Sequence, residues 1–314
     1  MPHPLKFMAM VKPGLDIDTD AVPDTVTRRR WIGAVAALAS GCAVDLDTDH
    51  RGSNAPAVAP LPKSPRVAWV LGSGGPRGFV HVGVIKALTE LGCKPDAIVG
   101  ASVGALVGTL FAAGLRANEI ERLALELQPA LLLRWQPGSS ERFSGAGVAS
   151  FVNSQVDGHL LQSLPIAMVC VVQRMRDGAV LGFSQGDAGL AVQAASAIEG
   201  QFTPVRIRGE LFADADLRMP LPVRLTRSLG ASRVLAVDTS AHEDRRPAGA
   251  ERYAASDQLK RALTQPDAVS ADVLLHPEFG YWAGVSAEYR RRVIAAGYAA
   301  TMAQAAALKA LHAA

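Results

Sequence analysis

The stretch that decides the fold is RVAWVLGSGGPRGFVHVGVIKALTELG, residues 66–92. It opens at residues 66–71 with a short apolar run rich in β-branched side chains, which is typical of a buried strand in a parallel sheet. A glycine-rich loop follows at residues 72–78. A helix is then predicted by apolar residues at helical spacing, namely Val80, Val84, Leu88 and Leu91. This order places free backbone N–H groups at a helix N-terminus, where negative charge is stabilised.

Two functions compete for this glycine loop. As a dinucleotide-binding fingerprint it fails, because the pattern that begins at Gly72 and Gly74 needs glycine or alanine where the chain has Arg77. As an oxyanion hole it succeeds, since glycines let a transient alkoxide approach backbone N–H groups closely. We therefore expect the loop to stabilise a developing negative charge.

The next segment repeats the same order of elements with a serine at its turn. A short apolar strand at residues 97–99 leads into Gly100-Ala-Ser102-Val-Gly104, and an apolar helix follows. Such a nucleophile elbow holds the serine in a strained, exposed position, and its glycines are needed because strand and helix pass each other there. The motif alone is a weak signal, and a chance serine in a glycine-rich turn is the alternative. Placed 28 residues after the loop glycine Gly74, it predicts a nucleophile at Ser102.

A serine hydroxyl needs a base to take its proton. Residues 210–214 read as a short strand that delivers Asp214 to a proline-rich loop, where a sheet presents a catalytic carboxylate. In an α/β-hydrolase a histidine would follow, and His242 is the best candidate. The residues alone leave three possibilities open: a Ser–Asp dyad, a triad of Ser102, Asp214 and His242, and an ordinary surface role for Asp214.

Together these segments resemble the bacterial patatin-like phospholipases. Residues 72–78 are similar to the family's Gly-Gly-Gly-x-Arg-Gly oxyanion loop, and residues 100–104 are similar to its nucleophile elbow. Residues 214–216 stand where the family has Asp-Gly-Gly or Asp-Gly-Ala, and residues 182–205 look like the stretch that leads to this aspartate. The resemblance runs from about residue 66 to residue 238 and continues more faintly to the C-terminal helix.

This resemblance implies an α/β fold with three α/β/α layers around a mainly parallel central sheet. It also implies hydrolysis of phospholipids or other acyl esters through an acyl-enzyme, without a metal or any other cofactor. Carried over by position, Ser102 is the nucleophile and Asp214 the base. The implied oxyanion hole consists of the backbone N–H groups of Gly74, Gly75 and Arg77.

Several positions depart from the family pattern: Ser73, Glu199, Ala215 and Asp216. The carboxylate of Asp216 raises the pKa of Asp214 if the two side chains converge, and does little if strand alternation points them to opposite faces. These departures keep a second function in view, a catalytically silent protein that binds or scaffolds at the cell envelope. Arg77 either steers a phosphate head group or pairs with a nearby acid.

Residues 1–42 read as a lipoprotein-type export signal. Three arginines at residues 28–30 precede about ten apolar residues and then small residues that end at Cys42. The apolar part is too short to span a bilayer as a helix. Residues 27–32 resemble a twin-arginine signal, and residues 38–42 resemble a lipoprotein cleavage box with Ala39 where leucine is usual. A lipidated Cys42 would anchor the protein to a membrane surface facing the periplasm. An amphipathic or buried first helix is the alternative.

Composition sets the remaining expectations. Residues 43–65 are rich in Pro, Asp, Ser and Ala without periodicity and predict a flexible tether, which leaves residues 66–314 as the hydrolase domain.

A net charge of +3 over 314 residues, with no basic run interleaved with aromatics, argues against a nucleic-acid partner. Three scattered cysteines do not form a disulfide framework or a zinc site. The sequence sets no oligomeric state.

Overall fold

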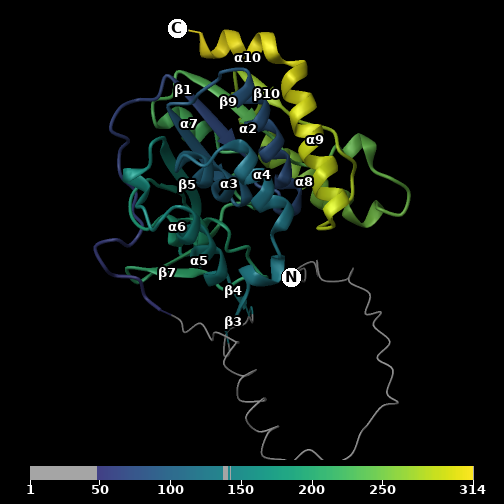
Figure 1. Cartoon of the computed structure of the whole chain (residues 1–314). Coiled ribbons are helices and arrows are strands. Elements are labelled where there is room, and N and C mark those ends of the chain that lie inside the picture. The colour runs from purple at the N-terminus through teal and green to yellow at the C-terminus, as the bar shows by residue number, and fades with distance from the viewer. Residues whose placement is uncertain (1–47, 137–140, 142, 314) are drawn as a thin grey trace, which may run out of the picture. The chain divides into compact units, whose positions relative to one another are not determined.

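The computed structural model describes residues 48–136, 141 and 143–313 (Figure 1). The predicted export signal with Cys42 and the start of the predicted tether lie outside the described residues. Over the ranges that are described, no helix combines the length and the apolar character needed to cross a membrane.

A mainly parallel sheet forms the centre of the domain (Figure 1). Its strands run in the order β10-β9-β1-β2-β5-β8-β7, and β6 also pairs with β5. The strands from β10 to β5 in this order are parallel, whereas β6 and β8 are antiparallel to β5. The bounds are β1 Val67–Leu71, β2 Ala97–Ala101, β5 Ala167–Arg174, β6 Val180–Phe183, β7 Val205–Ile207, β8 Glu210–Asp214, β9 Arg233–Val237 and β10 Val273–Leu275. A separate small sheet pairs β3 Arg134–Trp135 with β4 Phe143–Ser144.

Helices connect the strands and cover the sheet. The α-helices are α2 Val80–Glu90, α3 Val103–Ala112, α4 Ala117–Glu126, α5 Ala146–Gln155, α6 Ala188–Ala195, α7 Val223–Ser228, α8 Ala254–Ala268, α9 Ala287–Ala303 and α10 Ala305–His312. Short 3-10 helices are η1 Gly75–Phe79, η2 Pro129–Leu132, η3 Leu161–Ser163, η4 Glu243–Arg245 and η5 Glu251–Tyr253.

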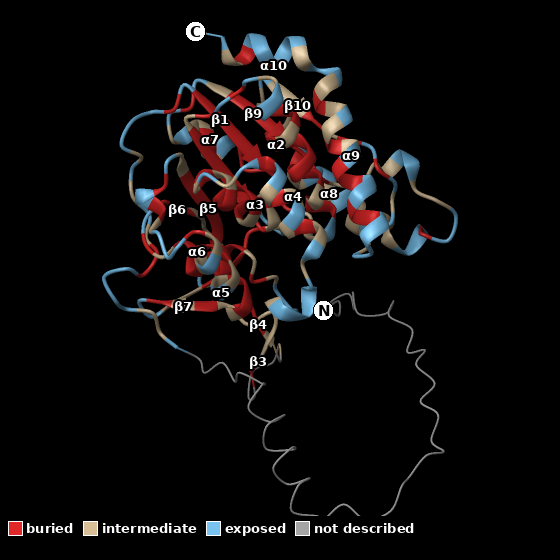
Figure 2. Ribbon diagram, viewed as in Figure 1, coloured by how far each residue is buried: buried red, intermediate tan, exposed pale blue. Residues whose placement is uncertain are grey.

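The strands of the sheet are buried (Figure 2), and because side chains alternate along each strand, they pack into two cores, one on each face. On β1, Trp69 and Leu71 belong to the core shared with α2, α3 and α9. Ala68 and Val70 belong to the core on the opposite face, which α7 and α8 cover. The three-layer α/β/α arrangement around a mainly parallel sheet is therefore confirmed.

The C-terminal helix α10 completes one side of this core. The indole nitrogen of Trp69 is fully buried and donates a hydrogen bond of 2.9 Å to Nε2 of His312. The Trp69 ring also stacks on Phe111, with ring centroids 5.6 Å apart. The contact satisfies the one polar atom of a large side chain, which would otherwise carry a desolvation cost.

Residues 48–65, the described part of the predicted tether, pack on the domain. His50 forms a β-bridge with Ile207, and Ala57 forms one with Gln185. The Ser184 hydroxyl accepts a hydrogen bond from the Ala59 N–H at 3.0 Å and donates one to the Ala59 carbonyl at 2.7 Å. A flexible tether does not describe these residues, because their extended backbone finds hydrogen-bond partners on the domain.

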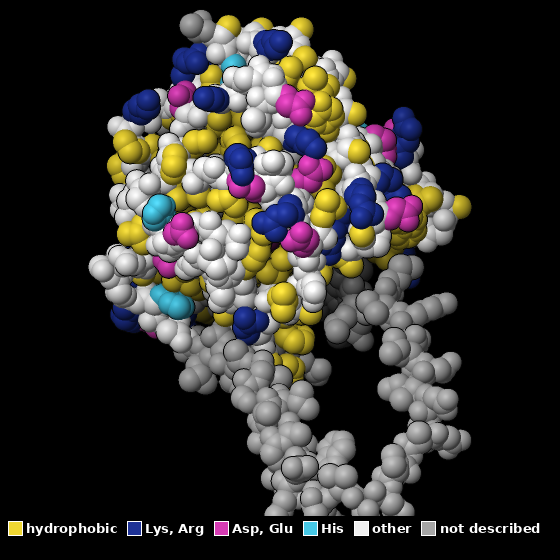
Figure 3. Space-filling model, in the orientation of Figure 1, with side chains coloured by type: hydrophobic (Ala, Val, Ile, Leu, Met, Phe, Trp, Pro, Cys, Tyr) yellow, Lys and Arg dark blue, Asp and Glu magenta, His cyan; other side chains and the backbone are white. Residues whose placement is uncertain are grey.

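Charges of both signs are mixed on the surface. On the face that Figure 3 shows, Lys and Arg side chains lie beside Asp and Glu side chains, with apolar areas between them. This face therefore presents no field of a single sign.

Candidate active site

Ser102 lies at the sharp turn between β2 and α3. Its backbone has φ 54 and ψ −125, a conformation that residues other than glycine rarely adopt and that costs about 1–3 kcal/mol. The strained turn predicted for the nucleophile is thus present. The exposure differs from the prediction, because only 4% of Ser102 is accessible to solvent.

The two elbow glycines are required by close packing. A Cβ on Gly104 would overlap the carbonyl oxygen of Leu71, and one on Gly100 would overlap the backbone of Gly104 and Ala105. Strands β1 and β2 pair in parallel here, with Leu71 opposite Gly100. Glycine at both positions therefore lets α3 start directly against the end of the sheet.

Asp214 lies at the end of β8 and faces the elbow. The residue is 4% exposed, and one carboxylate oxygen accepts the Asp216 N–H at 2.9 Å. The Ser102 hydroxyl acts on this carboxyl group as a hydrogen-bond donor and lowers its pKa. Within the described chain, the second oxygen, Oδ2, has no partner that meets full hydrogen-bond geometry. Ser102 and Asp214 are therefore neighbours, and hydrogen bonds in active sites are often loose before substrate binds.

The environment of Asp214 moves the titration of its carboxyl group toward neutral pH. Its pKa is raised to about 7, mainly by burial and also by the negative charge of Asp216. The Ser102 hydroxyl, the Asp216 N–H and the charge of Lys260 act in the opposite direction. A base is most effective when its pKa lies near the working pH.

Asp216 belongs to a second polar cluster beside the dyad. Its Oδ1 accepts hydrogen bonds from the Ser73 hydroxyl and from Nζ of Lys260, and Lys260 also donates to Ser73 Oγ at 3.0 Å. Burial favours the neutral form of Asp216, but Lys260 and Ser73 lower its pKa below the usual value. Because β8 ends at Asp214, strand alternation does not apply to Asp216, and its charge reaches Asp214.

The glycine loop offers two backbone donors rather than the three predicted. The N–H groups of Gly74 and Gly75 make no hydrogen bond with any residue that the structure describes. The N–H of Arg77 is already used, because it donates to the Gly74 carbonyl at 3.1 Å as η1 begins. The prediction of Arg77 as an oxyanion donor is therefore wrong. Gly75 has φ +52, which favours glycine at this position.

A family model described as patatin-like phospholipase matches residues 69–227, half of the chain. The match spans the glycine loop, Ser102 and Asp214. The chain belongs to the patatin-like phospholipase family.

Known relatives agree with this assignment. The chain is 34% identical over 212 residues to an uncharacterised NTE family protein of Mycobacterium tuberculosis, covering 66% of this chain and 58% of the relative. It is 28% identical over 188 residues to the human patatin-like phospholipase domain-containing protein 6, covering 57% of this chain and 14% of that protein. The chain thus spans less than two thirds of the length of either relative.

A solved structure shares the fold of this patatin-family chain. The crystal structure of VipD from Legionella pneumophila matches with a TM-score of 0.51 at 15% sequence identity. The match covers 88% of this chain and 73% of VipD. At this identity the likeness concerns the fold alone.

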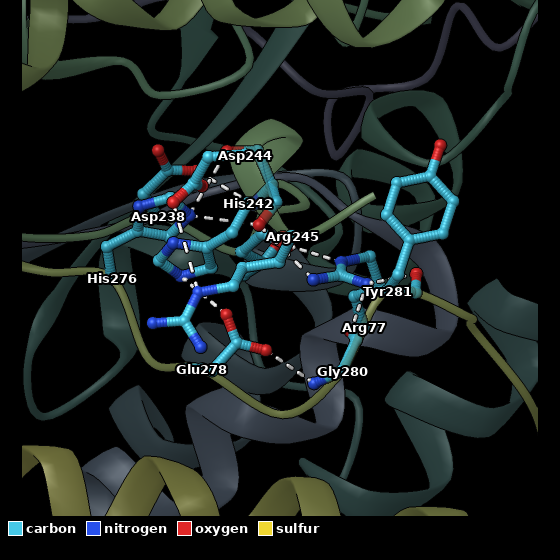
Figure 4. Close-up of polar contacts among 11 residues, drawn as sticks. Arg77, Asp238, His242, Asp244, Arg245, His276, Glu278, Gly280 and Tyr281 are labelled. Carbon is cyan, nitrogen blue, oxygen red and sulfur yellow. Dashed lines mark hydrogen bonds and ion pairs between the residues drawn. The ribbon is translucent and has the colours of Figure 1, made fainter. Parts of the chain in front are cut away.

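The family's loop arginine is here a structural residue (Figure 4). Arg77 is 9% exposed, and Cζ of its guanidinium lies 4.4 Å from the centroid of the Phe279 ring. It donates hydrogen bonds to the carbonyl oxygens of Thr239, Ser240, Gly280 and Tyr281 at 2.6–3.2 Å. These four acceptors take four of the five N–H groups of the guanidinium. Neither of the two roles considered for Arg77, phosphate steering and pairing with an acid, describes these contacts.

The histidine triad is not assembled in this structure. The His242 ring stacks on His276 with centroids 3.7 Å apart, and its Nε2 lies 3.6 Å from a Glu278 oxygen. Across the described ranges, neither a hydrogen bond nor an ion pair joins His242 to Ser102 or Asp214. The arrangement favours the dyad.

His81 supports the glycine loop from beneath. Its side chain is fully buried in α2, and Nε2 lies 2.8 Å from the Gly72 carbonyl oxygen. Burial lowers the pKa of His81 to about 4, so the ring is neutral near pH 7 and donates its proton to this oxygen. The residue is a packing histidine, not a base.

Sequence reasoning missed one charged residue of the site. Lys260 reaches Asp216 and Ser73 from α8, a helix that follows the catalytic segments in the chain. A single lysine in a polar helix forms no motif, so nothing in the sequence could single it out.

Proposed function

We propose that this chain is a serine acyl hydrolase that cleaves carboxylic esters of lipids, with phospholipids or lysophospholipids as the substrate class. The observation that carries the proposal is the pairing of a strained Ser102 with the buried carboxylate of Asp214. The free N–H groups of Gly74 and Gly75 supply the second requirement, an oxyanion site. The name of the human relative, patatin-like phospholipase domain-containing protein 6, is consistent with this substrate class.

The first half of the reaction transfers the acyl group to the enzyme. Asp214 takes the proton from Ser102 Oγ as this oxygen attacks the ester carbonyl carbon. The carbonyl oxygen becomes negatively charged, and the N–H groups of Gly74 and Gly75 stabilise it. When the tetrahedral intermediate collapses, the bond to the leaving alcohol breaks and Asp214 returns the proton to the alcohol.

The second half releases the fatty acid. A water molecule gives a proton to Asp214 and attacks the acyl carbon, again with the oxyanion held by the glycine loop. Collapse breaks the bond to Ser102 Oγ, which recovers its proton from Asp214. The dyad thus returns to its starting state without a third residue.

Hydrolysis assays test this proposal directly. The chain and its Ser102→Ala and Asp214→Asn variants are assayed on p-nitrophenyl butyrate and palmitate, and on phosphatidylcholine and lysophosphatidylcholine vesicles. Both variants are expected to lose about 1000-fold or more in kcat. Ser154→Ala and Asp157→Asn, at two exposed positions, are the matched controls and should retain activity.

Covalent labelling separates the enzyme from a silent relative. A fluorophosphonate probe should attach to the parent chain and not to Ser102→Ala. A parent chain that neither turns over any of these esters nor takes the label would overturn the proposal. The alternative function, a catalytically silent protein that binds or scaffolds, would then be favoured.

We further propose that the protein is held at the cell envelope by a lipid on Cys42. This proposal rests on the arginine, apolar and small-residue order of residues 27–42. Metabolic labelling with an alkyne-tagged fatty acid in a bacterial host tests it. Incorporation into the parent and its loss in Cys42→Ser are expected. Equal labelling of the two would contradict lipidation at this residue.

A further inference from the structure

We propose that Lys260 is a positioning residue of the active site, which neutralises Asp216 and holds it so that Asp214 can ionise and accept the Ser102 proton. The inference deepens the proposed function, because it rests on Asp214 as the base. Lys260 donates its hydrogen bonds to Asp216 and Ser73 rather than to Ser102 or Asp214, and its charge reaches Asp214 as well.

The contacts join three parts of the chain. Ser73 belongs to the glycine loop, Asp216 follows β8, and Lys260 comes from α8. Lys260 Nζ donates to both Ser73 Oγ and Asp216 Oδ1, and the Ser73 hydroxyl donates to the same Asp216 oxygen. The side chains of Lys260 and Asp216 are 22% and 32% exposed. The pair is therefore screened by water and salt less than a surface ion pair.

Asp216 acts on the base in two opposing ways. Its backbone N–H donates to Asp214 Oδ1 at 2.9 Å, which favours the ionised form of Asp214. Its carboxylate charge disfavours that form, because two negative charges repel in a buried site. Lys260 offsets the second effect and leaves the first in place. Without this cation, the hydrogen bond and the repulsion would compete at the base.

The same cluster also anchors the oxyanion loop. The Ser73 N–H donates to the Pro220 carbonyl at 2.9 Å, and the Ser73 carbonyl accepts a hydrogen bond from Thr239 Oγ1. Ser73 and Asp216 both depart from the family's glycines, and here the two departures bind each other and share Lys260. One cation therefore links the start of the oxyanion loop to the residue that follows the base.

Other charged groups near Lys260 have partners of their own. Lys260 shares a pocket with these titratable residues: Asp238, His242, Glu243, Asp244, Asp257, Arg261 and His276. Asp257 accepts from Arg246 at 3.0 Å and from the Tyr281 hydroxyl at 2.7 Å. Arg261 binds Glu243 at 2.6 Å, Asp238 accepts the Ser240 N–H at 2.8 Å, and Asp244 lies 3.9 Å from Arg245. His242 and His276 stack on each other. Asp216 is thus the acid with which Lys260 forms its ion pair.

The test is the pH profile of kcat/KM for p-nitrophenyl butyrate, with the pH profile of the fluorophosphonate labelling rate as a second readout. Lys260→Met leaves the Asp216 charge unopposed, so the acid limb should move to higher pH by about one unit. Lys260→Arg keeps the charge and should stay close to the parent. Adding Asp216→Asn to Lys260→Met should return the limb to, or below, its parental position.

Arg261→Met is the matched control, because it removes a neighbouring cation of the same helix that binds Glu243 instead. Its acid limb should coincide with that of the parent. An acid limb that does not move in Lys260→Met, or one that moves and is not returned by Asp216→Asn, would overturn the inference. Should Lys260→Met fail to fold, Asp216→Asn alone serves, and its acid limb should fall by about one unit. An unmoved limb there also overturns the inference. A parent chain without turnover or label contradicts the proposed function instead.

Discussion

Arg77 donates a hydrogen bond of 2.6 Å from Nε to the carbonyl oxygen of Thr239, whose side chain fills the space that a Cβ on Gly74 would need. The Thr239 hydroxyl in turn donates to the Ser73 carbonyl. The guanidinium of the glycine loop thus holds the residue that packs against the same loop from the end of β9. The shape of the glycine loop therefore depends on the Arg77 side chain, whose hydrogen bonds go to backbone carbonyl oxygens.

Arg77→Lys should destabilise the fold and slow every substrate equally. An ammonium group cannot reach the four carbonyl oxygens that the planar guanidinium serves, so buried acceptors lose their donors. We expect the free energy of unfolding to fall by about 1–3 kcal/mol in urea titrations. Arg176→Lys, at an arginine whose side chain is 63% exposed, is the control and should unfold like the parent. A loss confined to phospholipids, with neutral esters unaffected, would instead indicate head-group recognition by Arg77.

Ser102→Gly should abolish hydrolysis and should be more stable than the equally inactive variant Ser102→Ala. Glycine adopts the φ of 54 without the steric cost that serine bears, although it loses more backbone entropy on folding. The net gain over Ser102→Ala should be about 1 kcal/mol, measured as the difference in urea unfolding between the two inactive variants. Equal stabilities would show that the turn stores no strain.

The elements around the site could be predicted because their signals are local. The run at residues 66–71 became β1 (Val67–Leu71), and the helix expected after Ser102 became α3 (Val103–Ala112). Burial on both sheet faces dictates continuous apolar strands, which the sequence displays directly. Residues 48–65 were misjudged because their order comes from distant partners. Ser184, for example, lies 125 positions from Ala59.

The residues of the site also divide into those that local sequence signals predict and those that depend on distant partners. Ser102 could be predicted because it lies in a motif whose glycines are required by local packing. The role of Arg77 follows from Thr239, which is 162 positions away, and that of Lys260 from Ser73, which is 187 positions away. One sequence cannot show that such residues meet. The departures Ser73 and Asp216 were visible, but not that they bind each other.

His242→Ala should leave hydrolysis within about twofold of the parent, because the ring lies against His276 and Glu278 rather than the dyad. The comparison is kcat/KM on p-nitrophenyl butyrate from pH 5 to 9, beside Asp214→Asn. His159→Ala, at an exposed position, is the matched control. A loss as large as that of Asp214→Asn would restore the triad and contradict the dyad.

Asp214 should set the pH dependence of both activity and stability. Its pKa is raised to about 7, mainly by burial, and the protonated acid cannot take the Ser102 proton. Activity should therefore rise with pH through an acid limb centred near 7. The folded state also binds this proton more tightly than the unfolded chain, whose aspartate titrates near 3.8. The carboxyl therefore lowers the free energy of unfolding progressively as pH rises from about 4 to about 7.

Asp214→Asn removes that titration and keeps an oxygen that can accept the Asp216 N–H. Its melting temperature should lie close to that of the parent near pH 4 and exceed it by several degrees near pH 8. Melting curves across this range, with Asp157→Asn as the exposed control, make the comparison. A difference in melting temperature that stays constant with pH would mean that Asp214 titrates in the folded state as it does in the unfolded chain. The acid limb of activity would then have to come from another group.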